Sequence, residues 1–120
     1  MSKSCRLTLY GIPNCDTVKK ARAWLAERGK SHEFHDLKKH GVPPAELARW
    51  ADVVGWESLL NRRGTTWRKL TAEAQGAVRD SASAQVLMQA QTSVIKRPVV
   101  DWGGGEVTVG FDTEAWEKRV

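Results

Sequence analysis

Cysteine is scarce in this chain, whose 120 residues contain only Cys5 and Cys15. Two cysteines form at most one disulfide, so the multiple-disulfide framework of many small secreted domains is excluded. Long apolar runs are missing too, and no window approaches the roughly 18–20 apolar residues that a membrane-spanning helix needs. No charged start followed by an apolar run resembles a secretory signal. We therefore expect a cytoplasmic protein with reduced thiols and no membrane partner.

The chain also lacks a block of charge of one sign. Its formal net charge is +5, from 19 Lys and Arg against 14 Asp and Glu, and the basic pairs are scattered. Such an excess favours anionic small molecules or acidic protein surfaces. A dedicated nucleic-acid surface usually shows a denser basic stripe or a known module, so we expect no nucleic-acid partner. Repeats and linker-like segments are absent as well, which predicts a single domain over residues 1–120.

The first third of the chain alternates between strand and helix patterns. Polar and apolar residues alternate over Leu7–Gly11, which predicts a strand, and Asp16–Arg28 has helical spacing with Gly29 as its stop. Ser31–Leu37 follows at the position of a second strand. A strand, a helix and a strand within about 30 residues form a βαβ unit with parallel strands.

The middle of the chain shows no convincing strand, and strands return only near its end. Pro43 and Pro44 open a helix that ends at Gly55, and Ser83–Ala90 predicts another, with Val86, Leu87 and Ala90 on one face. The later elements are a strand at Val94–Val100, a turn at Gly103–Gly105, a strand at Glu106–Gly110 and a short helix capped by Asp112. The order β-α-β, helical segment, β-β-α predicts an α/β fold.

Cys15 stands between the first predicted strand and the first predicted helix. A thiol at this place meets the unpaired N–H groups and the positive dipole end of the helix, and both favour the thiolate. Lys19 adds a cation within the first turn, so we expect a lowered pKa and a reactive thiol. The alternative is that Cys15 is a small buried residue. The loop of Gly11, Pro13 and Asn14 before it disfavours burial.

Pro98 interrupts the predicted strand Val94–Val100. Proline removes a hydrogen bond from a strand ladder and is excluded from most central strands. It indicates either a cis peptide bond in a functional turn or an edge strand that tolerates a trans proline. The residues alone leave these two alternatives open.

Three segments together resemble a known family. Tyr10–Ala21, Leu60–Thr66 and Ile95–Val99 are similar to motifs of the arsenate reductase-related (ArsC/Spx) family, and most to its small YffB-type branch. The likeness spans nearly the whole chain. It implies a thioredoxin-like fold, with a four-stranded mixed sheet and a helical insertion at about residues 43–91. It also implies a cis peptide bond between Arg97 and Pro98.

The resemblance implies that Cys15 is the nucleophile but matches the family's anion site only in part. Glutaredoxin-coupled arsenate reductases hold their oxyanion with three arginines, and only Arg97 is matched in place. The first arginine position falls on Asn61, beside Arg62 and Arg63, and the third falls near Gly110. A lost guanidinium is not a conservative change for an oxyanion site, which disfavours arsenate as the substrate.

Cys15 has no expected partner thiol in the chain. The regulator branch of the family often carries Cys-x-x-Cys, but Val18 stands at the second position here. Cys5 lies before the first strand and Cys15 after it, and an extended strand at about 3.3 Å per residue separates them beyond the roughly 7 Å Cα limit of a disulfide. We expect Cys5 to be a bystander. An external thiol must then resolve Cys15, and glutathione is the expected co-substrate.

The sequence therefore predicts a monomeric, monothiol oxidoreductase with no bound cofactor. Its expected partner is glutathione, with glutaredoxin as a further candidate. His32, His35 and His40 show no metal-ligand spacing with cysteine or carboxylate, so no metal is expected. The alternatives are a true arsenate reductase and a non-enzymatic, Spx-like regulator that binds RNA polymerase. The predicted site consists of the nucleophile Cys15 and the anion- or thiol-binding residues Arg97, Arg62, Lys19, Asn14, Thr17 and Pro98.

Overall fold

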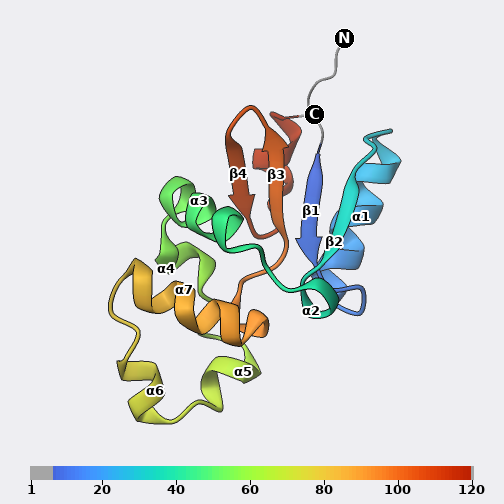
Figure 1. Ribbon diagram of the computed structural model, residues 1–120. Coiled ribbons are helices and arrows are strands. Elements are labelled where there is room, and N and C mark those ends of the chain that lie inside the picture. Colours follow the sequence, from blue (N-terminus) through green and yellow to red (C-terminus); the bar gives the residue numbers. More distant parts are fainter. Residues whose placement is uncertain (1–6, 120) are drawn as a thin grey trace. The chain divides into compact units, whose positions relative to one another are not determined.

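The computed structural model describes residues 7–119 (Figure 1). Contacts between Cα atoms divide the chain into two compact units. The first, here called the sheet unit, contains the residues up to His40 and those from Arg97 onward. The second, called the helical unit, is Gly41–Lys96. Cys5 lies outside the described residues, so its expected role as a bystander stays a prediction.

The sheet unit is built on four strands in the order β2-β1-β3-β4. β1 pairs with β2 in parallel, and the β1–β3 and β3–β4 pairs are antiparallel. A βαβ unit supplies β1 and β2 of this mixed sheet, and a β-hairpin supplies β3 and β4. This is the thioredoxin-like arrangement that was expected. The strands are β1 (Thr8–Gly11), β2 (Glu33–Asp36), β3 (Val99–Gly103) and β4 (Glu106–Val109).

The register of β1 against β3 brings two distant segments to one end of the sheet. Tyr10, near the end of β1, pairs with Val99, the first residue of β3. The strands are antiparallel, so the chain leaving β1 and the chain entering β3 meet at the same edge. The first of these segments carries Cys15, and the second carries Arg97 and Pro98.

One face of the sheet packs against α1 (Asp16–Glu27) and α8 (Thr113–Glu117). The apolar residues of α1 recur at helical spacing, which gives it a buried stripe. Trp116 of α8 lies at the centre, with its ring 5.1 Å from that of Trp102 and 5.7 Å from that of Trp24, both edge-on. The buried members of this core are Leu7, Leu9, Val18, Ala21, Trp24, Leu25, Val100, Trp102 and Trp116.

Two sequence-derived boundaries in the sheet unit are explained by capping. Gly29 ends α1 with φ +69°, and the N–H groups of Gly29 and Lys30 reach the carbonyls of Ala26 and Leu25. This is the Schellman pattern that a glycine stop predicts. The predicted strand 31–37 is too long, because the Asp36 carboxylate accepts from the N–H groups of Lys38 and Lys39. A short helix, α2 (Leu37–His40), therefore starts directly after β2.

The helical unit contains short helices and one isolated β-bridge, between Leu60 and Ile95. The predicted strand 94–100 is wrong in its first half. Val94 ends a 3-10 turn, and the Lys96 N–H donates to the Leu59 carbonyl at 2.7 Å rather than to the sheet. The elements are α3 (Pro44–Val54), α4 (Trp56–Leu59), α5 (Thr65–Arg68), α6 (Ala72–Gly76), α7 (Ser81–Ala90) and η1 (Thr92–Val94).

The face expected to be buried on α7 is also wrong. Val86 is 72% exposed, whereas Ala84 and Met88 are fully buried. The apolar residues of α7 itself are spread around most of its circumference, so the periodicity of its sequence does not indicate which face is buried. In the part of the chain that the structure describes, no helix has the length and apolar character needed to cross a membrane. The single domain over residues 1–120 stays a prediction.

Candidate active site

Cys15 is the N-cap residue of α1. Its backbone is extended (φ −96°, ψ 124°), and its carbonyl accepts the first helical hydrogen bond, from the N–H of Lys19 at 2.9 Å. Its own N–H donates to the Ile12 carbonyl at 3.4 Å, which closes a tight turn after β1. The thiol is half-buried. The turn therefore presents the sulfur to the unpaired N–H groups of the first helical turn.

The environment of the Cys15 thiol lowers its pKa below the ordinary value. Partial burial by itself raises the pKa, and it is the largest single influence. The backbone N–H of Val18, the Arg97 guanidinium and the N–H of Thr17 together outweigh it, because each stabilises the thiolate. The thiol makes no hydrogen bond of ideal capping geometry. Its acidity therefore comes from several converging donors rather than from one short bond.

Arg97 reaches the thiol from the segment that precedes β3. Its guanidinium contributes both a hydrogen bond to the Cys15 side chain and a favourable charge. The Arg97–Pro98 peptide bond is cis, as the family resemblance implied. Pro98 is buried, and its carbonyl accepts from the N–H of Gly110 at 2.9 Å. Backbone contacts thus tie this segment to the chain that follows β4.

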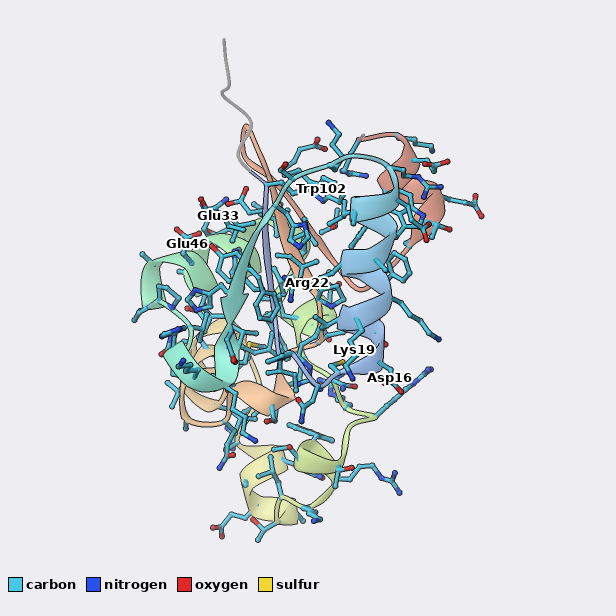
Figure 2. All side chains as sticks on the ribbon, turned by 90° about the vertical axis from the view of Figure 1, so that its right-hand side faces the viewer. Asp16, Lys19, Arg22, Glu33, Glu46 and Trp102 are labelled. Carbon is cyan, nitrogen blue, oxygen red and sulfur yellow. The ribbon has the colours of Figure 1, made fainter. Side chains whose placement is uncertain are left out.

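The other expected residues of the sheet unit differ in what they offer. The side chains of Asn14, Thr17 and Lys19 are exposed, and Thr17 acts on the thiol through its backbone N–H. Figure 2 shows Lys19 beside Asp16 at the start of α1, where an acidic side chain faces the helix N-terminus. The cation that lowers the Cys15 pKa is Arg97. The exposed Lys19 has little influence on the Cys15 pKa, because water and salt screen its charge.

Arg62 belongs to the helical unit. Its guanidinium lies 5.8 Å from the ring centroids of both Trp56 and Trp67, at the outer range of cation–π contact. The preceding Asn61 accepts from the N–H of Arg63 through Oδ1, at 3.1 Å. Asn61 is thus used in the local turn. The anion-binding role of Arg62 stays a prediction.

Gly110, near which the resemblance places the third family arginine, has a backbone conformation unsuited to arginine. Gly110 has φ +85°, a conformation that residues with a Cβ rarely adopt. Its N–H is used by Pro98. A glycine here serves the backbone contact that holds the Arg97–Pro98 segment.

Two contributors to the site escaped sequence reasoning, because they act through the backbone. The sequence shows Val18 only as the residue at the second position of a Cys-x-x-Cys motif, yet its N–H stabilises the thiolate. Its position three residues after the N-cap is the available signal, since such N–H groups are free to donate to a side chain at the N-cap. Gly11 is the other: a Cβ there would lie 2.7 Å from Val18 Cγ2. The glycine permits the close approach of β1 and α1.

Residues 7–119 contain no group of three or more His, Cys, Asp or Glu side chains that could hold a metal ion. His32 accepts from Arg22 Nε at 3.3 Å, and His35 stacks between Tyr10 and His40 at 5.0 and 5.8 Å. The three histidines therefore have local contacts in the sheet unit.

The fold and the site define a class: a thioredoxin-like protein with a thiol at the N-terminus of its first helix and an arginine followed by a cis proline beside it. The chain belongs to the ArsC family, whose model matches residues 10–119. An uncharacterised protein of Haemophilus influenzae is 36% identical over 111 residues, covering 92% of this chain and 96% of that protein. The global transcriptional regulator Spx of Streptococcus agalactiae is 25% identical over 96 residues, covering 78% and 69%.

Solved structures agree with this placement. The YFFB protein superimposes with a TM-score of 0.89 at 47% identity, covering 94% of this chain and 97% of that one. An arsenate reductase (ArsC) related protein from Brucella melitensis gives a TM-score of 0.75 at 47% identity, covering 98% and 97%.

Proposed function

We propose that this protein is a monothiol oxidoreductase that removes glutathione from mixed disulfides through Cys15. The observation that carries the proposal is the lowered pKa of Cys15, to which the N–H of Val18 and the hydrogen bond and charge of Arg97 contribute. A thiolate, not a thiol, attacks a disulfide sulfur. Membership of the ArsC family supports an oxidoreductase.

The reaction balances in two exchange steps. The Cys15 thiolate attacks the glutathione sulfur of a mixed disulfide R–S–S–G, so that a Cys15–glutathione disulfide forms and R–S⁻ leaves to take up a proton. A thiolate of free glutathione then attacks the glutathione sulfur on Cys15. Glutathione disulfide forms, and the Cys15 thiolate is restored. Arg97 stabilises this thiolate when it attacks and again when it leaves.

The need for an external thiol follows from the neighbours of Cys15. Val18, which is fully buried, occupies the place of a second cysteine in a Cys-x-x-Cys motif. Cys15 is the one cysteine among residues 7–119. Glutathione supplies both the thiol and negative charges that suit Arg97, and glutaredoxin is a further candidate donor.

The test is the reduction of a mixed disulfide of glutathione and 2-mercaptoethanol, coupled to glutathione reductase. We expect turnover with the unchanged protein and with C5S, a strong reduction with R97Q and none above background with C15S. R62Q tests the predicted anion-binding role of Arg62 in the same assay. Equal rates for the unchanged protein and C15S would refute the proposal.

Arsenate reduction is a second candidate, since the Brucella melitensis structure is an arsenate reductase related protein at 47% identity. Against it, only Arg97 of the three family arginines is matched in place, and Gly110, near the third position, has a positive φ that residues with a Cβ rarely adopt. Purified protein that oxidises glutathione only when arsenate is present would establish this activity. An NMR titration with glutathione and then arsenate helps to separate the two, because shifts of the Cys15 and Arg97 signals with glutathione and none with arsenate would support the first proposal.

A regulatory role is a third candidate, favoured by the 25% identity to Spx over 78% of this chain. Val18 in place of a second cysteine argues against a disulfide switch but not against protein binding. Recovery of RNA polymerase subunits with the tagged protein, together with no turnover in the disulfide assay, would favour regulation over catalysis.

A further inference from the structure

The sheet unit contains a cavity at the end opposite to Cys15. Its volume is about 510 Å³, within the range of small-molecule sites. The lining includes Leu7 before β1, Lys30 and Ser31 after α1, Gly103 at the end of β3 and Gly104 in the hairpin turn. α1 has 12 residues and therefore spans about 18 Å. In Figure 2, Trp102 of this cavity lies far from Asp16 and Lys19 at the start of α1.

The cavity carries an excess of positive charge. Among the described lining residues, Glu106 alone carries a carboxylate, which pairs with Arg119 at 3.3 Å. A second nitrogen of Arg119 donates to the Ala115 carbonyl at 2.8 Å. Lys30 and Lys118 also line the cavity, and within residues 7–119 no carboxylate forms an ion pair with either. Among these described residues, the two ammonium groups have no carboxylate partner and can attract an anion.

Lysines near helix C-termini often serve only to offset the helix dipole. Here other donors already meet several of the terminal carbonyls. At the end of α1, the N–H groups of Gly29 and Lys30 donate hydrogen bonds to the carbonyls of Ala26 and Leu25. At the end of α8, Arg119 Nη1 takes the carbonyl of Ala115. The ammonium groups of Lys30 and Lys118 are thus not needed to close the helix ends.

Part of the cavity wall is apolar. Leu7 and Trp102 line it while being only 7% and 8% exposed. The indole N–H of Trp102 already donates to Thr108 Oγ1 at 2.8 Å. The indole therefore has ring surface, and no further hydrogen bond, to offer a ligand.

We propose that this cavity is a second ligand site, which binds a small organic phosphate monoester. Lysine ammonium groups bind phosphate as point charges, and the Ser31 hydroxyl can donate to a phosphate oxygen. The two lysines match the two negative charges of the phosphate, and the apolar wall accepts the organic part. No residue of this site takes part in the thiol exchange at Cys15.

The test is an NMR titration of the full chain with adenosine monophosphate and, separately, with inorganic phosphate. We expect saturable shifts of the Ser31 and Gly104 amides and of the Trp102 indole N–H, with tighter binding of the nucleotide. Lys30→Gln combined with Lys118→Gln should weaken nucleotide binding about tenfold or more. Lys20→Gln combined with Lys39→Gln removes the same charge from exposed positions outside the cavity and should leave the affinity unchanged.

Three outcomes would overturn the proposal. They are no saturable shift with either probe, equal affinity for phosphate and the nucleotide, and equal weakening by the two double variants. The last would show nonspecific attraction to a basic protein. The glutathione assay is independent of this titration, so failure of one does not decide the other.

Discussion

At the scale of single residues, opposing influences set the pKa of the Cys15 thiol. Burial disfavours the thiolate, while the N–H groups of Val18 and Thr17 and the guanidinium of Arg97 favour it. Only Arg97 among these acts through its side chain, so it alone can be removed without disturbing the helix. Its replacement is therefore the sharpest test of the site.

R97Q should raise the pKa of Cys15 and slow its reaction with disulfides at neutral pH. A hydrogen bond to a charged group contributes about 1.5–3 kcal/mol, but the more basic thiolate is also the better nucleophile, which restores about half of the logarithmic loss. We expect rates lower by roughly three- to tenfold. Thiolate absorbance against pH and stopped-flow exchange with a disulfide measure the two effects.

K19Q is the matched comparison for R97Q, because Lys19 is an exposed cation at the same helix end. A small change with K19Q that disappears at high salt, next to a large one with R97Q, indicates a local bond. Equal effects of both variants would show that only the general positive field matters.

The thiolate should also make stability depend on pH. The folded pKa of Cys15 lies below that of the unfolded chain, about 8.5. The contribution is therefore present above the unfolded pKa and is lost as the pH falls through the folded pKa. The free energy of unfolding of the unchanged protein, relative to C15S, should rise as the pH increases through the folded pKa and level off above the unfolded pKa of about 8.5. Urea titrations of both proteins measure it, and a flat difference would contradict the lowered pKa.

G11A should affect both stability and acidity. The added methyl group would lie 2.7 Å from Val18 Cγ2, and Val18 is fully buried in the core. We expect destabilisation by about 1–3 kcal/mol from overpacking, together with a raised Cys15 pKa as the Val18 N–H is displaced. G76A is the control, because a Cβ at Gly76 meets nothing within 4 Å. A destabilised G11A with unchanged thiol acidity would limit Gly11 to packing.

At the scale of elements, α7 offers a direct test of which face is buried. Met88 is fully buried and Val86 is 72% exposed, two positions apart on one helix. M88A should lower the free energy of unfolding by about 2–5 kcal/mol. V86A should change it by no more than about 0.5 kcal/mol. Urea unfolding of the two variants measures this contrast, and a larger loss with V86A would restore the face expected from the sequence.

The elements also show how far the sequence reaches. The start of α1 after Cys15 and its end before Gly29 follow from side-chain and glycine signals that act within a few residues. The buried face of α7 and the early end of β2 depend on neighbours that periodicity does not contain. Likewise, the resemblance identifies Cys15 and Arg97. The contributions of Val18 and Gly11 are backbone effects, which the residue type does not predict.

At the scale of the whole molecule, the two units raise the question of cooperativity. The sequence predicts one domain, whereas the contacts fall into the sheet unit and the helical unit. A single domain below about 150 residues usually unfolds in one step. A destabilising change in one unit should then lower the stability of both.

Native-state hydrogen exchange of M88A decides this question, because it reports each unit separately. Met88 belongs to the helical unit, and the Val100 amide in β3 and the Ala51 amide in α3 report on the sheet and helical units. If the chain is one cooperative domain, M88A lowers the opening free energy of both amides by the same amount, about 2–5 kcal/mol. L9A changes the core of the sheet unit instead, and in one cooperative domain it should also lower the opening free energies of both amides equally. A loss confined to the unit that carries each substitution would show two independently unfolding parts. Cys15 and Arg97 both lie in the sheet unit, so in that case M88A should also leave the Cys15 pKa unchanged.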